Sequence, residues 1–227
     1  MNRETTDDYG EELVKLCGVI QNVLSLTLGL DEGFLHREFG EAGAGLRVNY
    51  YPRCPQPDLT LGLSPHSDPG GLTILLTDDH VKGLQVRKGG SWITVESIPD
   101  ALVVNVGDQI QVCFLLCGSC FCLLSFLIRM HVDVCLIYEE MFLEIRSKQC
   151  SSELYVEHRV VVNAVTERLS MAFFYNPQDD LLIHPAKELV AHDIYPMYKP
   201  KTFKEYKLCM RMLGPRGKTL ADAMKAT

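Results

Sequence analysis

Two histidine-containing segments that lie far apart in the sequence most constrain what this chain can fold into. The first is His66-Ser67-Asp68, and the second is His158 within the largely β-branched run Val156–Val162. Successive side chains of an extended strand point to opposite faces, so His66 and Asp68 share one face. If the fold brings His158 next to this pair, two imidazole nitrogens and one carboxylate oxygen can bind a single metal ion.

Two histidines and one carboxylate form the facial triad typical of non-haem Fe(II) sites, which leaves metal positions open for other ligands. Neither segment is specific alone, because a lone HxD is usually an exposed turn and a lone strand histidine is usually hydrogen-bonded. Further along, Arg168-Leu169-Ser170 places a cation and a hydroxyl at strand spacing. That pair is either a solvated strand face or a site for the far carboxylate of a small dicarboxylic acid. The combination of the three segments carries the prediction.

The sequence around these residues is similar to that of the plant 2-oxoglutarate/Fe(II)-dependent dioxygenases. Within that family, Ser64–Gly71 together with Ala172–Pro177 most resembles the jasmonate-induced oxygenases, which hydroxylate jasmonic acid. Leucoanthocyanidin dioxygenase-like proteins are close relatives. The motifs that carry the resemblance are Leu46–Pro57, the HxD segment, Gly83–Val86, Val106–Asp108, Glu157–Arg159 and Arg168-x-Ser170.

The resemblance implies a mainly β fold with flanking helices around a double-stranded β-helix (jelly-roll) core. It implies that His66, Asp68 and His158 are the metal ligands and that no further side chain is catalytic. The implied cofactors are Fe(II), O2 and 2-oxoglutarate as a co-substrate, and ascorbate is expected to support activity.

The resemblance also implies binding residues for the two organic molecules. For 2-oxoglutarate they are Arg168, Ser170, Tyr51 and Asn49. For the substrate they are Arg47, Phe174 and Lys207. Lys207 stands where the relatives have an arginine, so this chain keeps the charge but loses the bidentate fork.

We expect the reaction to be hydroxylation of a small organic substrate, with jasmonic acid or a related carboxylate hormone favoured. Flavonoid oxidation of the leucoanthocyanidin dioxygenase type is an alternative. A second alternative is a catalytically impaired fragment or pseudoenzyme, because the chain is N-terminally truncated relative to the family and has an atypical central segment.

Composition narrows the possible partners and the compartment. The net charge of −7 provides no basic stripe for nucleic acid, so we expect a small-molecule partner and a monomer. An acidic protein that binds acidic molecules needs local cations, and Arg47, Arg53 and Arg168 are the candidates. The nine cysteines show no paired CxxC units, and residues 1–10 do not resemble a signal peptide. Free thiols in a cytoplasmic protein are therefore expected.

Periodicity predicts three regions. Residues 1–45 form a helical N-terminal remnant, with helices at Glu11–Leu28 and Asp31–Phe39. Residues 46–197 form the jelly-roll domain, interrupted by an atypical insertion at 112–155, and residues 198–227 form a C-terminal helical segment beginning at Tyr198. The predicted strands are Leu46–Tyr51, Leu61–His66, Leu72–Thr77, Leu84–Lys88, Ser91–Thr94, Ala101–Val106, Val156–Asn163 and Arg168–Tyr175.

The atypical insertion begins with Val112–Ile128, which contains no charged residue. We interpret the insertion as translated intron sequence, since relatives carry only a short strand and turn at this position. A transmembrane helix needs about 20 apolar residues, which is slightly longer than this run. A surface helix would need a polar face, which the run lacks. We therefore expect no membrane association.

Overall fold

The computed structural model describes residues 3–88, 90–110, 134–136, 157–184, 186 and 200–213. The predicted insertion at 112–155 lies outside the described residues, apart from the short strand β7 (Val134–Leu136). The part of the predicted C-terminal helix beyond residue 213 lies outside them as well. The predicted division of the chain at residues 45 and 198 stays a prediction.

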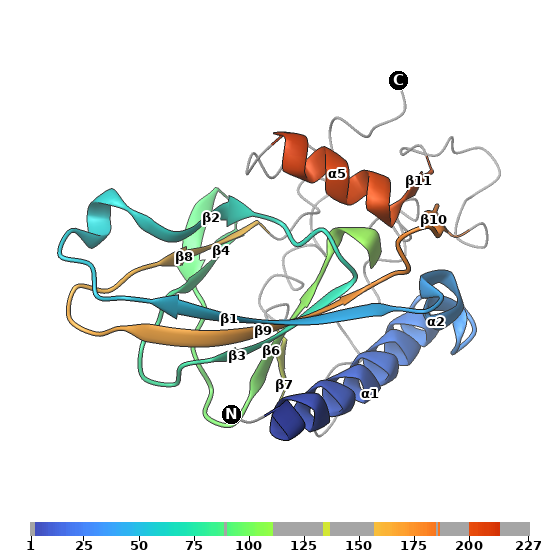
Figure 1. The fold of residues 1–227 in the computed structure, drawn as a ribbon, viewed down its shortest axis with the longest axis horizontal. Coiled ribbons are helices and arrows are strands. Elements are labelled where there is room, and N and C mark those ends of the chain that lie inside the picture. Colours follow the sequence, from blue (N-terminus) through green and yellow to red (C-terminus); the bar gives the residue numbers. More distant parts are fainter. Residues whose placement is uncertain are drawn as a thin grey trace.

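Two sheets that are antiparallel except for one strand pair form the body of the molecule (Figure 1). The larger sheet has the strand order β1-β9-β3-β6-β7, with only β6 and β7 parallel, and the smaller sheet has the order β2-β8-β4-β5. The chain passes from one sheet to the other between β2 and β3, so the two sheets form a jelly roll, as predicted. The strands are β1 (Gly43–Tyr51), β2 (Leu61–His66), β3 (Leu72–Thr77), β4 (Leu84–Lys88), β5 (Ser91–Thr94), β6 (Leu102–Val106), β8 (His158–Val161) and β9 (Arg168–Asn176).

Helices α1 (Arg3–Thr27) and α2 (Phe34–Phe39) pack against the larger sheet. They form one hydrophobic cluster with its strands, in which Leu24 and Phe39 come from the helices and Ile74 and Phe173 come from β3 and β9. A second, smaller cluster lies between the two sheets and contains Tyr51, Leu84, Val103 and Val160. The first cluster, called the outer cluster below, therefore packs on one face of the larger sheet. The other face of that sheet is directed toward the smaller sheet.

Helix α1 begins eight residues before the predicted start at Glu11. Its first turns are exposed and show no apolar periodicity, so the sequence pattern gave no signal there. Arg3 and Asp7 form an ion pair of 3.7 Å at i,i+4 spacing on this exposed part.

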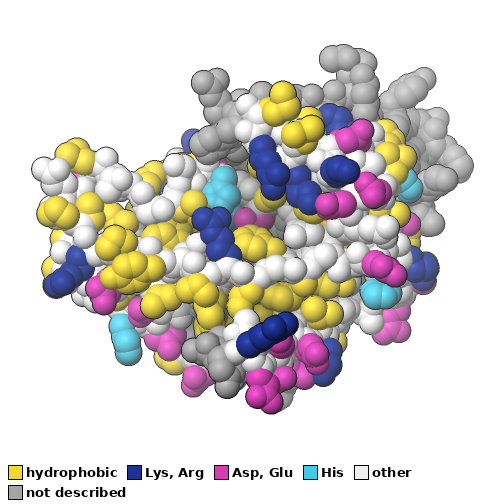
Figure 2. Space-filling model, in the orientation of Figure 1, with side chains coloured by type: hydrophobic (Ala, Val, Ile, Leu, Met, Phe, Trp, Pro, Cys, Tyr) yellow, Lys and Arg dark blue, Asp and Glu magenta, His cyan; other side chains and the backbone are white. Residues whose placement is uncertain are grey.

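Strands β1 and β9 pair antiparallel over their whole length, with Asn49 opposite Ser170 and Tyr51 opposite Arg168. Their side chains alternate between the two faces: the side chain of Tyr51 is 8% exposed, whereas Tyr50 is 58% exposed. Hydrophobic side chains form a band across the surface over β1 and β9 in Figure 2.

The C-terminal helix also differs from the prediction. Lys201 and Thr202 form β11, which pairs with β10 (Leu182–Ile183), and α5 (Phe203–Leu213) follows at once. The helix cannot start at Tyr198 as predicted, because the extended pair at β11 precedes it. Among the described residues, no helix combines the length and apolar character that crossing a bilayer requires.

Candidate active site

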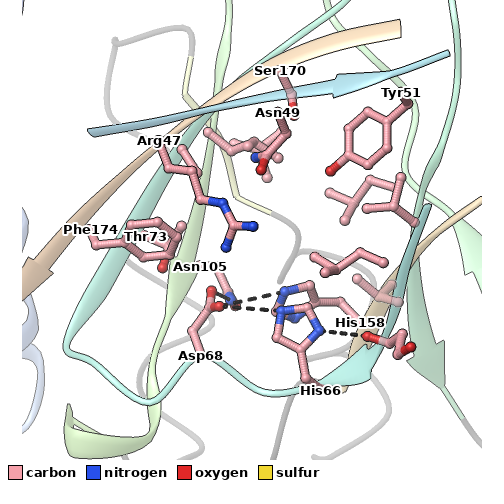
Figure 3. A pocket seen from close by; sticks show the side chains of 18 of the residues that line it. Arg47, Asn49, Tyr51, His66, Asp68, Thr73, Asn105, His158, Ser170 and Phe174 are labelled. Carbon is pink, nitrogen blue, oxygen red and sulfur yellow. Dashed lines mark hydrogen bonds and ion pairs between the residues drawn. The ribbon is translucent and has the colours of Figure 1, made fainter. Parts of the chain in front are cut away.

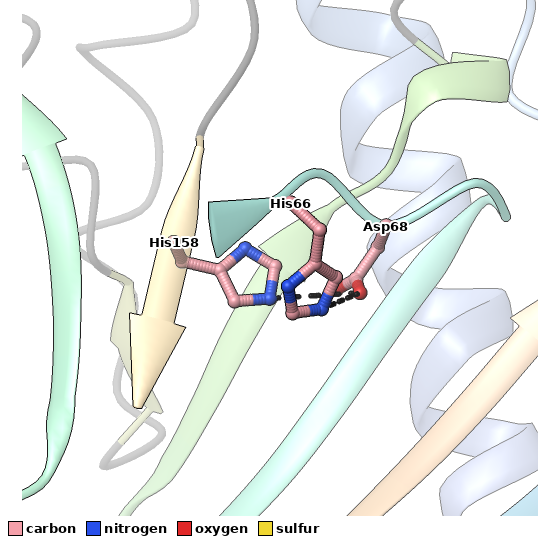
Figure 4. Close-up of side chains that lie close together, drawn as sticks. All are labelled: His66, Asp68 and His158. Atoms are coloured by element: carbon pink, nitrogen blue, oxygen red, sulfur yellow. Dashed lines mark ion pairs between the residues drawn. The ribbon is translucent and has the colours of Figure 1, made fainter. Parts of the chain in front are cut away.

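The fold brings the two histidine segments together (Figure 4). His66 ends β2, Asp68 lies in the loop that leads to β3, and His158 begins β8, where it pairs with His66 across the sheet. Oδ1 of Asp68 lies 3.8 Å from Nε2 of His66 and 3.6 Å from Nε2 of His158. One ligand atom from each residue falls within 4.8 Å of the others, so the predicted convergence is confirmed. Their role as metal ligands stays a prediction.

The surroundings of His66 favour the form that binds metals. Its Nδ1 lies 2.7 Å from the carbonyl oxygen of Ser64, which can only accept, so Nδ1 carries the proton and Nε2 is left with its lone pair. Burial lowers the pKa of His66, and the neighbouring His158 lowers it further. A neutral imidazole is the species that coordinates a metal ion.

The loop that carries Asp68 is fixed by the segment that follows β6. The backbone N–H of Asp108 donates to the carbonyl of Asp68 (2.8 Å), and the N–H of Gln109 donates to the carbonyl of Gly70 (3.0 Å). At Gly107 an added Cβ would lie 3.1 Å from the Asp68 carbonyl oxygen and still closer to Gly70, so this approach requires glycine.

The Asp108 side chain links this loop to α5. Its Oδ2 accepts hydrogen bonds from Oγ of Ser67 (3.0 Å) and from the hydroxyl of Tyr206 on α5 (2.6 Å). Burial raises the pKa of Asp108 to about 7, while the two hydrogen bonds act in the opposite direction. Asp108 therefore couples the position of the helix to the position of the metal loop.

The four residues predicted to bind 2-oxoglutarate lie side by side on β1 and β9. Asn49 and Tyr51 face the same side as Ser170 and Arg168, their partners across the strand pair, and all four line one cavity. The same face of β9 continues with Ala172 and Phe174, which also line it. The alternation predicted from the sequence is confirmed, and the binding roles stay predictions.

Arg168 is a buried cation with unused hydrogen-bonding capacity. Its side chain is 4% exposed, and its Nε donates to the carbonyl of Val81 (3.1 Å). Its NH1 has no hydrogen-bond partner among the described residues. Burial lowers the pKa of the Arg168 guanidinium, but arginine stays protonated in proteins. A buried charge of this kind favours an anionic ligand, which would pair with it.

The cavity has a volume of about 500 Å³ and includes both the triad and Arg168 in its lining. Figure 3 shows Arg47 reaching from β1 toward Asp68 and His66, with Phe174 nearby and Tyr51 on the other side of the cavity. The side chain of Arg47 makes no hydrogen bond or ion pair within the described part of the chain. This volume suits a small organic ligand, for which pockets of about 300–1,000 Å³ are usual.

Two predicted cations lie elsewhere. Nζ of Lys207 forms an ion pair with Asp179 (2.5 Å) and lies over the ring of Phe203, and it is not among the residues that line the cavity. Its substrate-binding role therefore gains no support from the geometry and stays a prediction. Arg53 is exposed and does not line the cavity either, because it follows the end of β1.

Sequence reasoning missed four polar residues that line the cavity, which are Ser64, Thr73, Asn105 and Arg211. Arg211 of α5 lines it one helical turn beyond Lys207, and Asn105 of β6 lines it beside Asp68. The signal for Asn105 was a polar residue within the apolar strand Leu102–Val106. Arg211 gave no comparable signal, because its position depends on how α5 docks.

The residues present fit the cofactors that the resemblance implies. Two imidazoles and one carboxylate whose ligand atoms lie within 4.8 Å of one another are a donor set suited to Fe(II), and a buried guanidinium with an unpartnered donor suits a carboxylate. The fit to a carboxylate rests on NH1 of Arg168, which has no hydrogen-bond partner among the described residues.

Comparison with known proteins shows which proteins this chain resembles. The sequence profile of the 2OG-Fe(II) oxygenase superfamily matches residues 42–121. Over these residues the chain is therefore similar to the 2OG-Fe(II) oxygenases.

The chain is also similar to particular proteins. The chain is 49% identical over 225 residues to Jasmonate-induced oxygenase 2 of Arabidopsis thaliana, covering 97% of this chain and 51% of that protein. It is 37% identical over 206 residues to Flavanone 3-dioxygenase 2 of Oryza sativa subsp. japonica, covering 90% of this chain and 49% of that protein. The crystal structure of JOX2 in complex with 2OG, Fe and JA matches with a TM-score of 0.78 and 47% identity, covering 99% of this chain and 57% of that one. The chain thus spans about half the length of the curated relatives it matches.

Proposed function

We propose that the chain acts as an Fe(II)- and 2-oxoglutarate-dependent dioxygenase that hydroxylates a small carboxylate-bearing substrate, with jasmonic acid or a related hormone favoured. The observation that carries this proposal is the placement of the triad, Arg168 and Arg47 along one cavity. Similarity to the jasmonate-induced oxygenases supports the substrate class.

His66, Asp68 and His158 would hold the iron on one side and leave its other side open to the cavity. When bound, Fe(II), 2-oxoglutarate and O2 supply an oxidative decarboxylation that yields succinate, CO2 and a hydroxylated product. The chain contributes by placing the ligands and one substrate C–H bond in a fixed arrangement.

The co-substrate would lie along β1 and β9. Arg168 would bind its far carboxylate through NH1, and the hydroxyls of Ser170 and Tyr51 would donate to the same oxygens, with Asn49 adjacent. Ser170 and Tyr51 are 4% and 8% exposed, so these hydrogen bonds would form out of contact with bulk water.

The substrate would bind where Arg47 reaches into the cavity. Its guanidinium would pair with the substrate carboxylate, and Phe174 would pack against the apolar part. Arg211 provides a second cation in the lining, which favours a carboxylate substrate over a neutral one. A flavonoid needs no such cation, so flavonoid oxidation is the second candidate and rests on the similarity to flavonoid-oxidising relatives.

Three further expectations belong to this proposal. Ascorbate would support activity by keeping the iron reduced, and the protein would act as a monomer in the cytoplasm. The thiols of Cys17, Cys54 and Cys209 are free, as expected in a reducing compartment.

The test measures two activities of the same variants with Fe(II), ascorbate and 2-oxoglutarate: hydroxylation of jasmonic acid, and succinate formation without substrate. Arg47→Ala should lower kcat/KM for jasmonic acid about 10- to 150-fold, because a hydrogen bond to a charged group contributes ~1.5–3 kcal/mol. It should leave succinate formation in the absence of substrate unchanged. The matched control is Arg53→Ala, which removes an exposed arginine outside the cavity and should change neither activity.

Equal loss of both activities in Arg47→Ala would argue against a substrate-binding role for this residue. A wild-type chain that forms no succinate would instead support the impaired-fragment alternative. Mass spectrometry of products from a pool of plant acids and flavonoids distinguishes hydroxylation of a carboxylate such as jasmonic acid from flavonoid oxidation.

A further inference from the structure

Asn105 makes a short and buried contact with the carboxylate of the triad. Its Nδ2 donates a hydrogen bond to Oδ2 of Asp68 at 2.6 Å, and its side chain is 8% exposed. It comes from β6 of the larger sheet, whereas His66 and His158 come from the smaller sheet. The two sheets therefore meet at the Asp68 side chain.

This contact gives the two oxygens of the Asp68 carboxylate different partners. Asn105 binds Oδ2, while Oδ1 is the oxygen that lies 3.8 Å and 3.6 Å from the two imidazole nitrogens. The torsion that rotates a carboxylate is broad, so a carboxylate without a partner would sample many orientations. The amide donor selects the orientation in which a single oxygen faces the histidines.

The other contacts around Asp68 do not have this effect. The N–H of Asp108 binds the backbone carbonyl of Asp68, and the Asp108 side chain binds the hydroxyl of the preceding residue, Ser67. These bonds fix the loop but leave the Asp68 carboxylate free to rotate. Within the described residues, Asn105 donates a hydrogen bond to this carboxylate, whereas the two histidines lie 3.8 Å and 3.6 Å from its other oxygen.

A buried amide at this position also has a cost. Oδ1 of Asn105 has no hydrogen-bond partner in the described part of the chain. A buried unpartnered polar atom costs about 1–3 kcal/mol, which an apolar side chain on this strand would avoid. The cost would be offset if the bond to Asp68 improves metal binding.

We propose that Asn105 is a positioning residue that presents one oxygen of Asp68 to the metal ion. The proposal rests on the metal site proposed above and adds to it a residue of the opposite sheet. It requires Asn105 to act through Asp68, without contacting the metal or the substrate itself.

The experiment titrates the purified full chain with Co(II), whose visible absorption reports both affinity and ligand arrangement without turnover. Asn105→Leu fills a similar volume and removes the donor, and Asn105→Ala removes the donor without adding bulk. Both should weaken Co(II) binding about 10- to 100-fold, as loss of a residue that orients a metal ligand typically does. Both should also change the absorption spectrum of the bound ion.

The control is Val104→Ala, one residue away on the same strand. Val104 is 0% exposed and packs in the outer hydrophobic cluster, so this variant weakens β6 without touching the site. It should lower the melting temperature of the metal-free protein and leave Co(II) affinity and spectrum unchanged. Far-UV circular dichroism identifies which of the two Asn105 variants is folded and can be compared.

Wild-type affinity and an unchanged spectrum in a folded Asn105 variant would overturn the positioning role alone. Equal weakening in Val104→Ala would also overturn it, because the effect would then be a general loss of strand stability. If the wild-type chain binds no Co(II), the proposed metal site itself fails.

Discussion

Gly83 controls how closely the Arg168 side chain lies against the neighbouring strand. An added Cβ at Gly83 would lie 3.0 Å from Cδ of Arg168, 3.2 Å from its Nε and 3.1 Å from the carbonyl oxygen of Val161. The carbonyl cannot move without disturbing β8, so the arginine would have to shift. Gly83→Ala should therefore raise the KM for 2-oxoglutarate about tenfold or more, because the bond to the far carboxylate is worth ~1.5–3 kcal/mol.

Succinate formation at varied 2-oxoglutarate concentration measures this KM. Gly43→Ala is the matched control, because Gly43 is the first residue of β1 and an added Cβ there meets nothing within 4 Å. An unchanged KM in Gly83→Ala would show that Arg168 either tolerates the shift or does not bind the co-substrate.

The sequence allowed the prediction of those site residues that follow a local alternation. His66 and Asp68 are two residues apart, as are Arg168 and Ser170, and each pair does face the cavity. Asn105 and Arg211 could not be assigned in this way, since each reaches the cavity through contacts between distant elements.

At the scale of elements, α5 begins with a reciprocal capping arrangement. The hydroxyl of Thr202 accepts from the N–H of Glu205 (3.2 Å), and the Glu205 carboxylate accepts from the N–H of Thr202 (2.9 Å). The helix then presents Tyr206 to Asp108 and Arg211 to the cavity. The capping of the first turn of α5 therefore affects where Arg211 lies in the cavity lining.

The charge of Glu205 should make this start sensitive to pH. The backbone N–H of Thr202, and next its hydroxyl, lower the pKa of Glu205 below the ordinary 4.5. A lowered pKa means that the contribution to stability is present above about pH 4.5 and is lost as the pH falls through the folded-state pKa. Glu205→Gln keeps a hydrogen-bond acceptor but not the charge, so it should melt slightly below the wild type at pH 7.

Thermal unfolding of both proteins between pH 7 and pH 3 checks this prediction. The difference in melting temperature should shrink toward zero in acid, when the glutamate of the wild type is protonated. A difference that stays constant over this range would mean that the charge does not contribute.

The boundaries of elements were less predictable than their existence. Strands β2 to β5 begin and end where alternation and turn residues indicated. Helix α1 extends over polar residues that carry no periodic signal, and α5 starts later because β11 pairs with β10. The additional first turns of α1 are local and exposed. The start of α5 depends on the pairing of β11 with β10, which comes from another part of the sequence.

At the scale of the whole molecule, the site depends on the closure of two sheets. His66 and His158 belong to the smaller sheet, and the strand that provides Asn105 belongs to the larger one. The sequence separation of the ligands means that the metal site forms only when distant strands have paired. Metal binding should therefore stabilise the folded state as a whole.

This linkage gives a measurement that does not need the substrate. Co(II) at about 100 times its Kd should add about 2.7 kcal/mol to the free energy of unfolding. For a chain of this size that corresponds to about 5–10 °C in melting temperature, and EDTA should reverse it. His158→Ala should lose most of the shift, whereas His36→Ala, an exposed histidine on α2, should retain it. A full shift in His158→Ala would place the metal elsewhere on the molecule, and the pairing of β2 with β8 would then have no bearing on metal binding.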